Sequence, residues 1–273
     1  MSDPADRSQL DLVRERFTRT ATEFADFSLA VRSAEAERLA TLAAPKDTEV
    51  ALDLACGPGT FARAFARRVR WICGLDLTPA LLERARRAAA ADNLTNMLFV
   101  CGDAKSLPFA PGTFDVATCG YSLHHMTDPA AAVAELARVV HKGGRVALLD
   151  LIAPEESPRA NANNDIERAR DASHVSTLPA SELAHLAKAA GFRITQRVIE
   201  ERPRSFDDWM RIAGWKPGDA AYAEARRMME ASLEGDAAGF HPRISGAAAA
   251  GASQAAPELE FVQTSLFLIA ERR

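Results

Sequence analysis

Carboxylates and small residues that directly follow apolar runs are the residues most suited to bind a ligand. A glycine turn after the apolar run 50–54 lets the backbone approach a ligand closely. A carboxylate after the next run can accept both hydroxyls of a ribose, and a third carboxylate can accept from the exocyclic amine of an adenine. The residues at these positions are Asp53, Ala55, Cys56, Gly57, Gly59 and Thr60 in and around the turn, then Asp76 and Leu77, then Gly102, Asp103 and Ala104, and lastly Gly120.

The residues of the turn indicate whether the bound nucleoside carries phosphates. A dinucleotide site needs a G-x-G-x-x-G pattern, whereas Phe61 and Ala62 follow Gly59 with no third glycine. The Gly-Lys-Ser/Thr of a P-loop is also missing. Two carboxylates without a basic cradle suit a nucleoside that lacks phosphates, and S-adenosylmethionine is such a ligand. Glycines between a strand and a helix can also form a plain connection. The neighbouring segments are therefore needed to distinguish a ligand-binding turn from such a connection.

Apolar runs alternate with helical periodicity, and this alternation positions the candidate residues. Runs typical of buried parallel strands lie at 50–54, 71–75, 97–101, 114–119 and 145–151. They predict an α/β fold with a doubly wound sheet and right-handed crossovers, whose ligands lie at the carboxyl ends of the strands. Further along, the sequence predicts helices at 161–172, 179–190, 206–212 and 220–233, and two more strands at 192–200 and 261–270.

Composition limits the classes of partner. The 273 residues include 33 basic and 37 acidic side chains, which gives a net charge of −4 and no broad attraction for nucleic acid. Because there is no run of 18 apolar residues and no signal-peptide core, we expect a cytoplasmic protein without an integral membrane span. The four cysteines lack zinc-site spacing, so no metal is expected. A homodimer is compatible with the sequence.

Five segments in order resemble the motifs of class I S-adenosylmethionine-dependent methyltransferases, most closely the ubiquinone/menaquinone C-methyltransferases. They are DLACGPGT, GLDLT, CGDAKSLPF, FDVATCGYSLHHMTDP and HKGGRVALLDL. The resemblance implies a Rossmann-like sheet of seven mostly parallel strands with the last antiparallel. It also implies that Asp53 and the glycine turn border the methionine tail, Asp76 binds the ribose, Asp103 and Ala104 meet the adenine, and Gly120 passes beside the sulfonium. Ala55 departs from the glycine common at its position, which costs little if the backbone stays in an allowed region.

The resemblance also suggests a division of the chain into a helical cap, residues 1–45, and a methyltransferase domain, residues 46–273. The segment RFTRTATEFADF is similar to a helix that caps the cofactor in quinone-type members. Phe17, Thr18 and Phe24 are therefore candidate contacts, with plain packing as the alternative. Segments 153–178 and 201–257 are expected to form the acceptor pocket and lid. Residues 235–257, rich in glycine and alanine, predict a mobile loop that serves as a lid or as a plain linker.

Methyl transfer from a sulfonium is a direct displacement, so alignment of the reactants is the main requirement. If the acceptor must lose a proton, the candidate bases are His174, His125 and His124, and each could instead be structural. The predicted function is methyl transfer to C, O or N of a small, apolar cyclic or aromatic acceptor. The alternatives are a nicotinamide-dependent oxidoreductase and a non-catalytic S-adenosylmethionine-binding protein.

Overall fold

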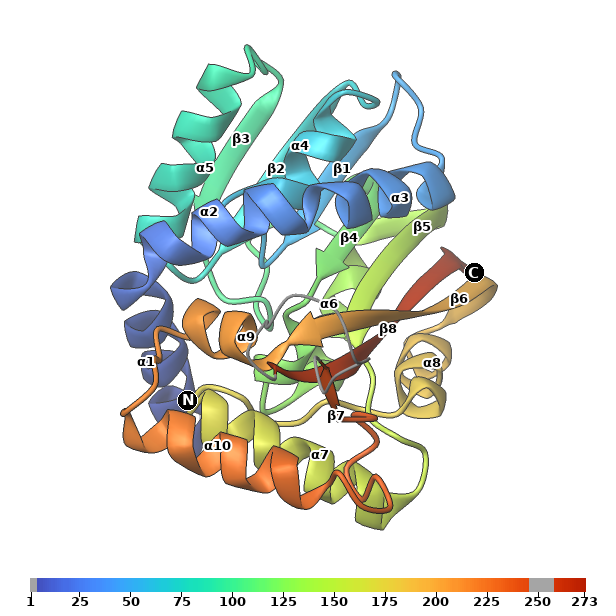
Figure 1. Cartoon of the computed structure of the whole chain (residues 1–273). Coiled ribbons are helices and arrows are strands. Elements are labelled where there is room, and N and C mark those ends of the chain that lie inside the picture. Colours follow the sequence, from blue (N-terminus) through green and yellow to red (C-terminus); the bar gives the residue numbers. More distant parts are fainter. Residues whose placement is uncertain (1–3, 246–257) are drawn as a thin grey trace, which may run out of the picture.

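A central sheet with helices on both faces forms the body of the molecule in the computed structural model, which describes residues 4–245 and 258–273 (Figure 1). In the described residues the helices are α1 (Pro4–Arg19), α2 (Ala21–Val31), α3 (Ser33–Ala43), α4 (Thr60–Ala66), α5 (Pro79–Ala91), the short 3-10 helix η1 (Leu123–His125), α6 (Pro129–Val139), α7 (Ser157–Arg170), α8 (Ala180–Ala189), α9 (Phe206–Ile212) and α10 (Ala220–Ala231). The strands are β1 (Val50–Leu54), β2 (Trp71–Asp76), β3 (Met97–Cys101), β4 (Phe114–Gly120), β5 (Val140–Leu151), β6 (Phe192–Ser205), β7 (Arg243–Ser245) and β8 (Glu258–Arg272).

The strand order is β3-β2-β1-β4-β5-β8-β6, with β7 paired to β8. Strands β1 to β5 pair in parallel, and β8 runs antiparallel to β5, β6 and β7. The expected doubly wound, mostly parallel sheet with an antiparallel last strand is thus confirmed. The eighth strand is the short β7, which lies inside the expected loop 235–257. Residues 246–257 of that loop lie outside the described residues.

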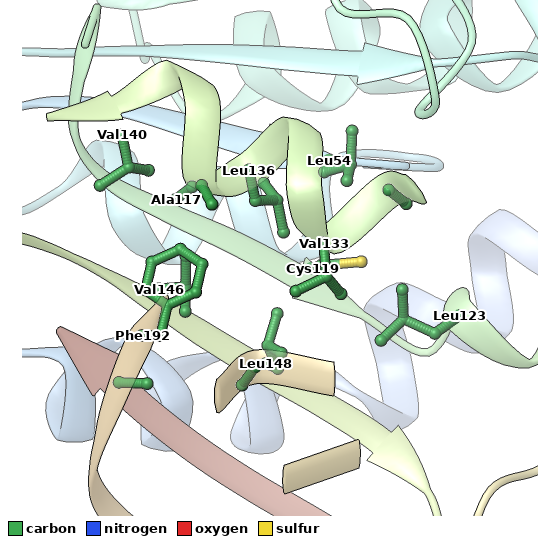
Figure 2. Packing of buried hydrophobic residues seen from close by; sticks show 14 of the residues in the cluster. Leu54, Ala117, Cys119, Leu123, Val133, Leu136, Val140, Val146, Leu148 and Phe192 are labelled. Carbon is green, nitrogen blue, oxygen red and sulfur yellow. The ribbon is translucent and has the colours of Figure 1, made fainter. Parts of the chain in front are cut away.

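One face of the sheet is covered by α6 and α8. Figure 2 shows Val133 and Leu136 of α6 packed toward Leu54 and Leu148 of the sheet, with Phe192 nearby. These side chains are buried, as the helical spacing of the α6 residues predicts. Asp128 caps α6, because its Oδ1 accepts the amide of Ala131 at 2.9 Å. This packing fixes where β4 and β5 end.

The other face of the sheet is covered by α3 and α4. Leu39 of α3 and Phe65 of α4 are fully buried against Ile72 and Leu149. Alanines at the remaining contacts let these helices lie close to the strands. The expected helical character of residues 1–45 is confirmed by α1, α2 and α3, which form three consecutive helices rather than one.

A third apolar cluster lies beyond the carboxyl edge of the sheet. Strands β6 and β8 pair along residues 192–205 and 260–272, whereas β5 pairs with β8 only up to Ser265, so a two-stranded ribbon extends past the other strands. Phe261 of this ribbon shares a buried cluster with one or more side chains from each of three helices: Ile166 of α7, Phe206 and Trp209 of α9, and Met229 of α10. In Figure 1, α7 and α10 run side by side below the sheet. The ribbon and these helices form a lobe that faces the strand ends.

Strand β5 begins five residues earlier than expected, at Val140 instead of Arg145. His141–Gly144, which precede the expected strand 145–151, belong to β5 as well. A Cβ at Gly144 would lie 2.7 Å from the carbonyl oxygen of Asp115 in β4, so glycine is what allows the two backbones to approach. Among the described helices, none has the length and apolar character needed to cross a bilayer.

Candidate active site

An open cavity of about 940 Å³ lies at the carboxyl ends of β1 to β4 and is called the first cavity below. Helices α1 and α2 cover it through Leu10, Val13, Phe17 and Phe24. The predicted site residues that line it are Phe24, Ala55, Cys56, Gly57, Thr60, Asp76, Leu77, Gly102, Asp103, Ala104, Gly120 and His125.

Three predicted cofactor-binding residues do not line the first cavity. Thr18 is exposed on α1. The face of α1 that points toward the cavity is the one that carries Val13 and Phe17. Gly59 packs against α5, where a Cβ would lie 3.1 Å from the Cβ of Ala85. Asp53 is fully buried inside β1. Contact of these three residues with a cofactor therefore stays a prediction.

Asp76 joins the end of β2 to the glycine turn. Its Oδ2 accepts the amide of Gly57 at 2.8 Å, and its Oδ1 accepts the amide of Thr78 at 2.8 Å. Burial raises the pKa of this carboxyl, and the two amides oppose that effect. The hydroxyl of Thr78 also hydrogen-bonds this carboxylate. Because a carboxylate has about four acceptor positions, one remains for a hydroxyl group in the cavity. This arrangement suits a ribose.

The glycine turn lies directly under α2. Gly57 has φ +54°, and a Cβ there would lie 3.7 Å from the ring of Phe24. A side chain at Gly57 would therefore occupy the space between the turn and α2. Ala55 has φ +53°, in the small left-handed region that costs an alanine roughly 1 kcal/mol. The turn keeps a backbone that favours glycine even where the residue is alanine.

The carboxyl group of Asp53 is buried and faces the backbone of Ala62. Neither oxygen accepts a hydrogen bond from the part of the chain that the structure describes. Burial raises its pKa well above the usual range, and the nearby Asp76 raises it further. Asp103, by contrast, is half-buried at the cavity and accepts the amide of Lys105 on Oδ1 at 2.9 Å. That bond leaves Oδ2 of Asp103 to meet a ligand.

The end of β4 is held in an unusual conformation beside the cavity. A Cβ at Gly120 would lie 2.6 Å from the ring of Phe61, so only glycine lets that ring pack under the strand end. Tyr121 follows with φ +54°, which is rare for a bulky residue and marks strain of the kind found at functional sites. Its ring faces the guanidinium of Arg32 at 4.0 Å. Sequence analysis missed Tyr121 and Arg32, although both line the cavity.

A second open cavity, of about 1020 Å³, adjoins the first and is called the second cavity. The two share lining residues, which are Phe17, Phe24, Arg32, Tyr121 and His125. The expected acceptor segments 153–178 and 201–257 contribute His174, Arg204 and Trp209, among others, to its wall. Trp215 and Phe240 serve elsewhere: Trp215 donates to the carbonyl of Arg170 at 2.7 Å, and Phe240 packs in the third apolar cluster.

The three candidate histidines come together at the second cavity. The ring centroids of His124 and His125 lie 4.3 Å apart, and His174 lies 5.6 Å from His124. His124 Nδ1 lies 2.5 Å from Oδ1 of Asp150. His125 Nδ1 bonds to the carbonyl of Ser173 at 3.0 Å, and His174 Nε2 bonds to Asn164 at 2.8 Å. Each ring is therefore fixed by a different partner.

Burial separates the chemistry of these histidines. Burial, followed by the adjacent His124, lowers the pKa of His125 to about 3 and that of His174 to about 2. Both rings are therefore neutral near pH 7 and are weak proton acceptors. A carboxylate partner on one ring nitrogen makes the other nitrogen a better base, and His124 has such a partner in Asp150. Among the three, His124 is the one whose ring bonds to a carboxylate.

Comparison with known proteins agrees with this site. Residues 52–148 match the family model described as a methyltransferase domain. An uncharacterized methyltransferase, YcgJ of Bacillus subtilis, is 35% identical over 163 residues, which are 60% of this chain and 64% of YcgJ. The crystal structure of YcgJ aligns with a TM-score of 0.78 at 27% identity, over 88% of this chain and 99% of that structure.

Two further relatives extend the comparison. The uncharacterized protein YafE of Escherichia coli is 32% identical over 145 residues, which are 53% of this chain and 70% of YafE. The ubiquinone/menaquinone biosynthesis C-methyltransferase UbiE of Roseobacter denitrificans is 32% identical over 168 residues, which are 60% of this chain and 63% of UbiE. The matches thus span just under two thirds of YcgJ and of UbiE.

The strand order, the glycine turn and the matched domain define a methyltransferase with a Rossmann-like fold. More narrowly, the chain belongs to the class I S-adenosylmethionine-dependent methyltransferases, with UbiE-like quinone methyltransferases among its relatives. The family expected from the five sequence motifs is confirmed.

Proposed function

We propose that this protein transfers a methyl group from S-adenosylmethionine to a small-molecule acceptor. The observation that carries the proposal is the pair of adjoining cavities, one with the glycine turn and Asp76, the other behind Tyr121 and His125. Reactants in the two cavities would meet at the shared wall. Methyl transfer needs this alignment of nucleophile, methyl and leaving sulfur.

The residues of the first cavity fit the cofactor. Asp76 has one acceptor position left for a ribose hydroxyl, and Oδ2 of Asp103, which accepts no hydrogen bond from the described residues, suits the adenine amine. The bare turn at Gly57 leaves room for the methionine tail. When bound, the cofactor would supply an electrophilic methyl group on a sulfonium. Helices α1 and α2 would act as its cap, through apolar residues that exclude water from the transfer.

The second cavity supports an acceptor with an apolar cyclic or aromatic body. Phe17, Phe27 and Trp209 line it and offer flat apolar contacts. An acceptor phenol, enol or amine would lose its proton to Nε2 of His124, since Asp150 holds the Nδ1 side. Methylation at C, O or N fits this arrangement equally. No feature of either cavity favours the nicotinamide-dependent oxidoreductase.

Two measurements test the proposal. Calorimetry with S-adenosylhomocysteine should show one binding site per chain, and NAD should give no heat of binding. A panel of phenols, enols and aromatic amines incubated with labelled S-adenosylmethionine should then yield a labelled product. Absence of S-adenosylhomocysteine binding would contradict the cofactor assignment. Binding without transfer to any member of the panel would favour the non-catalytic alternative.

A further inference from the structure

The second cavity is rich in arginine. Its wall includes five arginines and three acidic residues, which are Arg16, Arg32, Arg170, Arg204, Arg211, Glu167, Asp171 and Asp208. Such a concentration is unusual in a chain with a net charge of −4. The pairing of these charges shows which of them are available to a ligand.

Each acidic residue of this wall is already paired with a different arginine. The pairs are Arg16 Nε–Asp171 Oδ2 at 2.8 Å, Arg170 Nη1–Glu167 Oε2 at 3.6 Å and Arg211 Nη2–Asp208 Oδ1 at 2.9 Å. Three arginines are thus neutralised within the wall. Arg32 and Arg204 remain without an acidic partner in it.

Arg32 has no ion pair with any described residue. Its Nε is buried and lacks a hydrogen-bond partner among residues 4–245 and 258–273. Nearby acids are engaged elsewhere: Glu35 pairs with Arg202 at 2.7 Å, and Asp150 holds His124. The face of Tyr121 is the main contact of the Arg32 guanidinium. A buried donor without an acceptor destabilises the folded chain unless a ligand satisfies it.

Arg204 is the second available cation. Its Nε donates to Oε1 of Gln263 at 3.3 Å, and it makes no ion pair within the described part of the chain. The guanidinium carbons of Arg32 and Arg204 lie 5.5 and 5.9 Å from the centroid of the same ring, that of Phe27, so the two cations lie in one part of the cavity. Burial lowers the pKa of Arg32, Tyr121 and Glu35 raise it, and the charge of Arg204 lowers it. An anion between the two guanidinium groups would remove their mutual repulsion.

We propose that Arg32 and Arg204 bind an anionic group, a carboxylate or a phosphate, carried by the methyl acceptor. Guanidinium groups bind both kinds of anion through paired N–H donors. The aromatic side chains of Phe27 and Trp209 in the same wall suit the apolar body of such a molecule. The acceptor class is then a small aromatic or cyclic acid. This inference rests on the proposed function, because it concerns the acceptor of the same reaction.

The test compares three probes on the full chain saturated with S-adenosylhomocysteine. Benzoate, phenyl phosphate and neutral benzyl alcohol are titrated by calorimetry. At least one anion should bind more tightly than benzyl alcohol. Arg204→Gln should weaken that anion about 10- to 100-fold and leave the affinity for S-adenosylhomocysteine unchanged, since Arg204 does not line the first cavity. Arg32→Gln should weaken the anion as well.

A matched control is Arg193→Gln, which removes an exposed arginine on β6 that pairs with Glu271 outside both cavities. It should leave all affinities unchanged, and thermal melting should show that every variant is folded. Preference for benzoate or for phenyl phosphate identifies the source of the anion. Equal binding of the three probes, or anion binding that Arg204→Gln does not weaken, would overturn the inference. Failure of the wild-type chain to bind S-adenosylhomocysteine would instead contradict the proposed function.

Discussion

His124 Nδ1 lies 2.5 Å from Oδ1 of Asp150, which joins the turn after β4 to the end of β5. The same carboxylate accepts the amides of Leu123 and Leu151, at 2.9 and 2.8 Å. These bonds hold Asp150 in place, so the imidazole has one orientation and one favoured tautomer. Among the described residues no hydrogen bond is formed to Nε2 of His124, and a fixed ring with an available nitrogen is the arrangement that general-base catalysis needs.

Replacement of this ring should slow the reaction without affecting the cofactor. His124→Ala is expected to lower the rate of labelled methyl transfer by roughly 10²- to 10⁴-fold for an acceptor that must lose a proton. The affinity for S-adenosylhomocysteine should stay the same, because His124 does not line the first cavity. His185→Ala, on an exposed position of α8, is the matched control. An unchanged rate in His124→Ala would show that the contact between His124 and Asp150 is structural.

Loss of the Asp76 carboxylate should abolish cofactor binding. Asp76→Ala removes the acceptor proposed for the ribose and also frees the amides of Gly57 and Thr78. We expect S-adenosylhomocysteine binding to fall by at least about 100-fold in calorimetry. Asp47→Ala, at an exposed turn before β1, should bind like the wild type. Near-normal binding by a folded Asp76→Ala variant would remove Asp76 from the site.

A methyl group at Gly120 should disturb the cavity floor. The Cβ of Gly120→Ala would lie 2.6 Å from the ring of Phe61, which must move. We expect a loss of about 1–3 kcal/mol in the free energy of unfolding, measured by urea denaturation. Adding Phe61→Leu should recover part of that loss, which a double-mutant cycle measures as coupling. Strict additivity of the two changes would show that the contact does not matter.

Acid should destabilise the fold through the buried histidines. In the folded state, burial keeps His125 and His174 neutral down to about pH 3 and about pH 2, whereas in the unfolded chain they take up protons below about pH 6.5. The unfolded state therefore binds more protons in this range, and stability falls as the pH drops from 6.5 toward 3. Urea denaturation at several pH values measures the slope. His125→Gln should reduce the slope of stability against pH. His185→Gln, at an exposed position of α8, should leave the slope unchanged.

Sequence patterns were most informative where local chemistry dictates structure. Buried strands and the small or acidic residues after them gave the sheet and most of the first cavity, because parallel strands bring their carboxyl ends to one edge. Helix α1 carried a readable signal as well: Leu10, Val13 and Phe17 share one helical face, and that face lines the cavity. The same face explains why Thr18 is exposed.

Long-range pairing was harder to foresee. Nothing near Arg32 or Arg204 in the chain reveals that the acids around them are bound to other arginines. Tyr121 was missed because a positive φ at a tyrosine has no local signature. The order of the histidines as bases also depended on contacts from distant segments, such as Asp150 to His124. Such preferences are set by tertiary structure.

The register of the extended ribbon of β6 and β8 determines where Arg204 lies in the second cavity. Arg204 pairs with Phe261 in a ladder that continues unbroken from Gln196 to Ser205, and Glu200 and Arg202 on the same strand bind α3. A shift of one residue in this register would turn Arg204 to the opposite face, whereas a shift of two would keep the face and move the charge by about 6.6 Å. A two-residue change of register would therefore move this cation along the ribbon and leave the residues of the first cavity where they are.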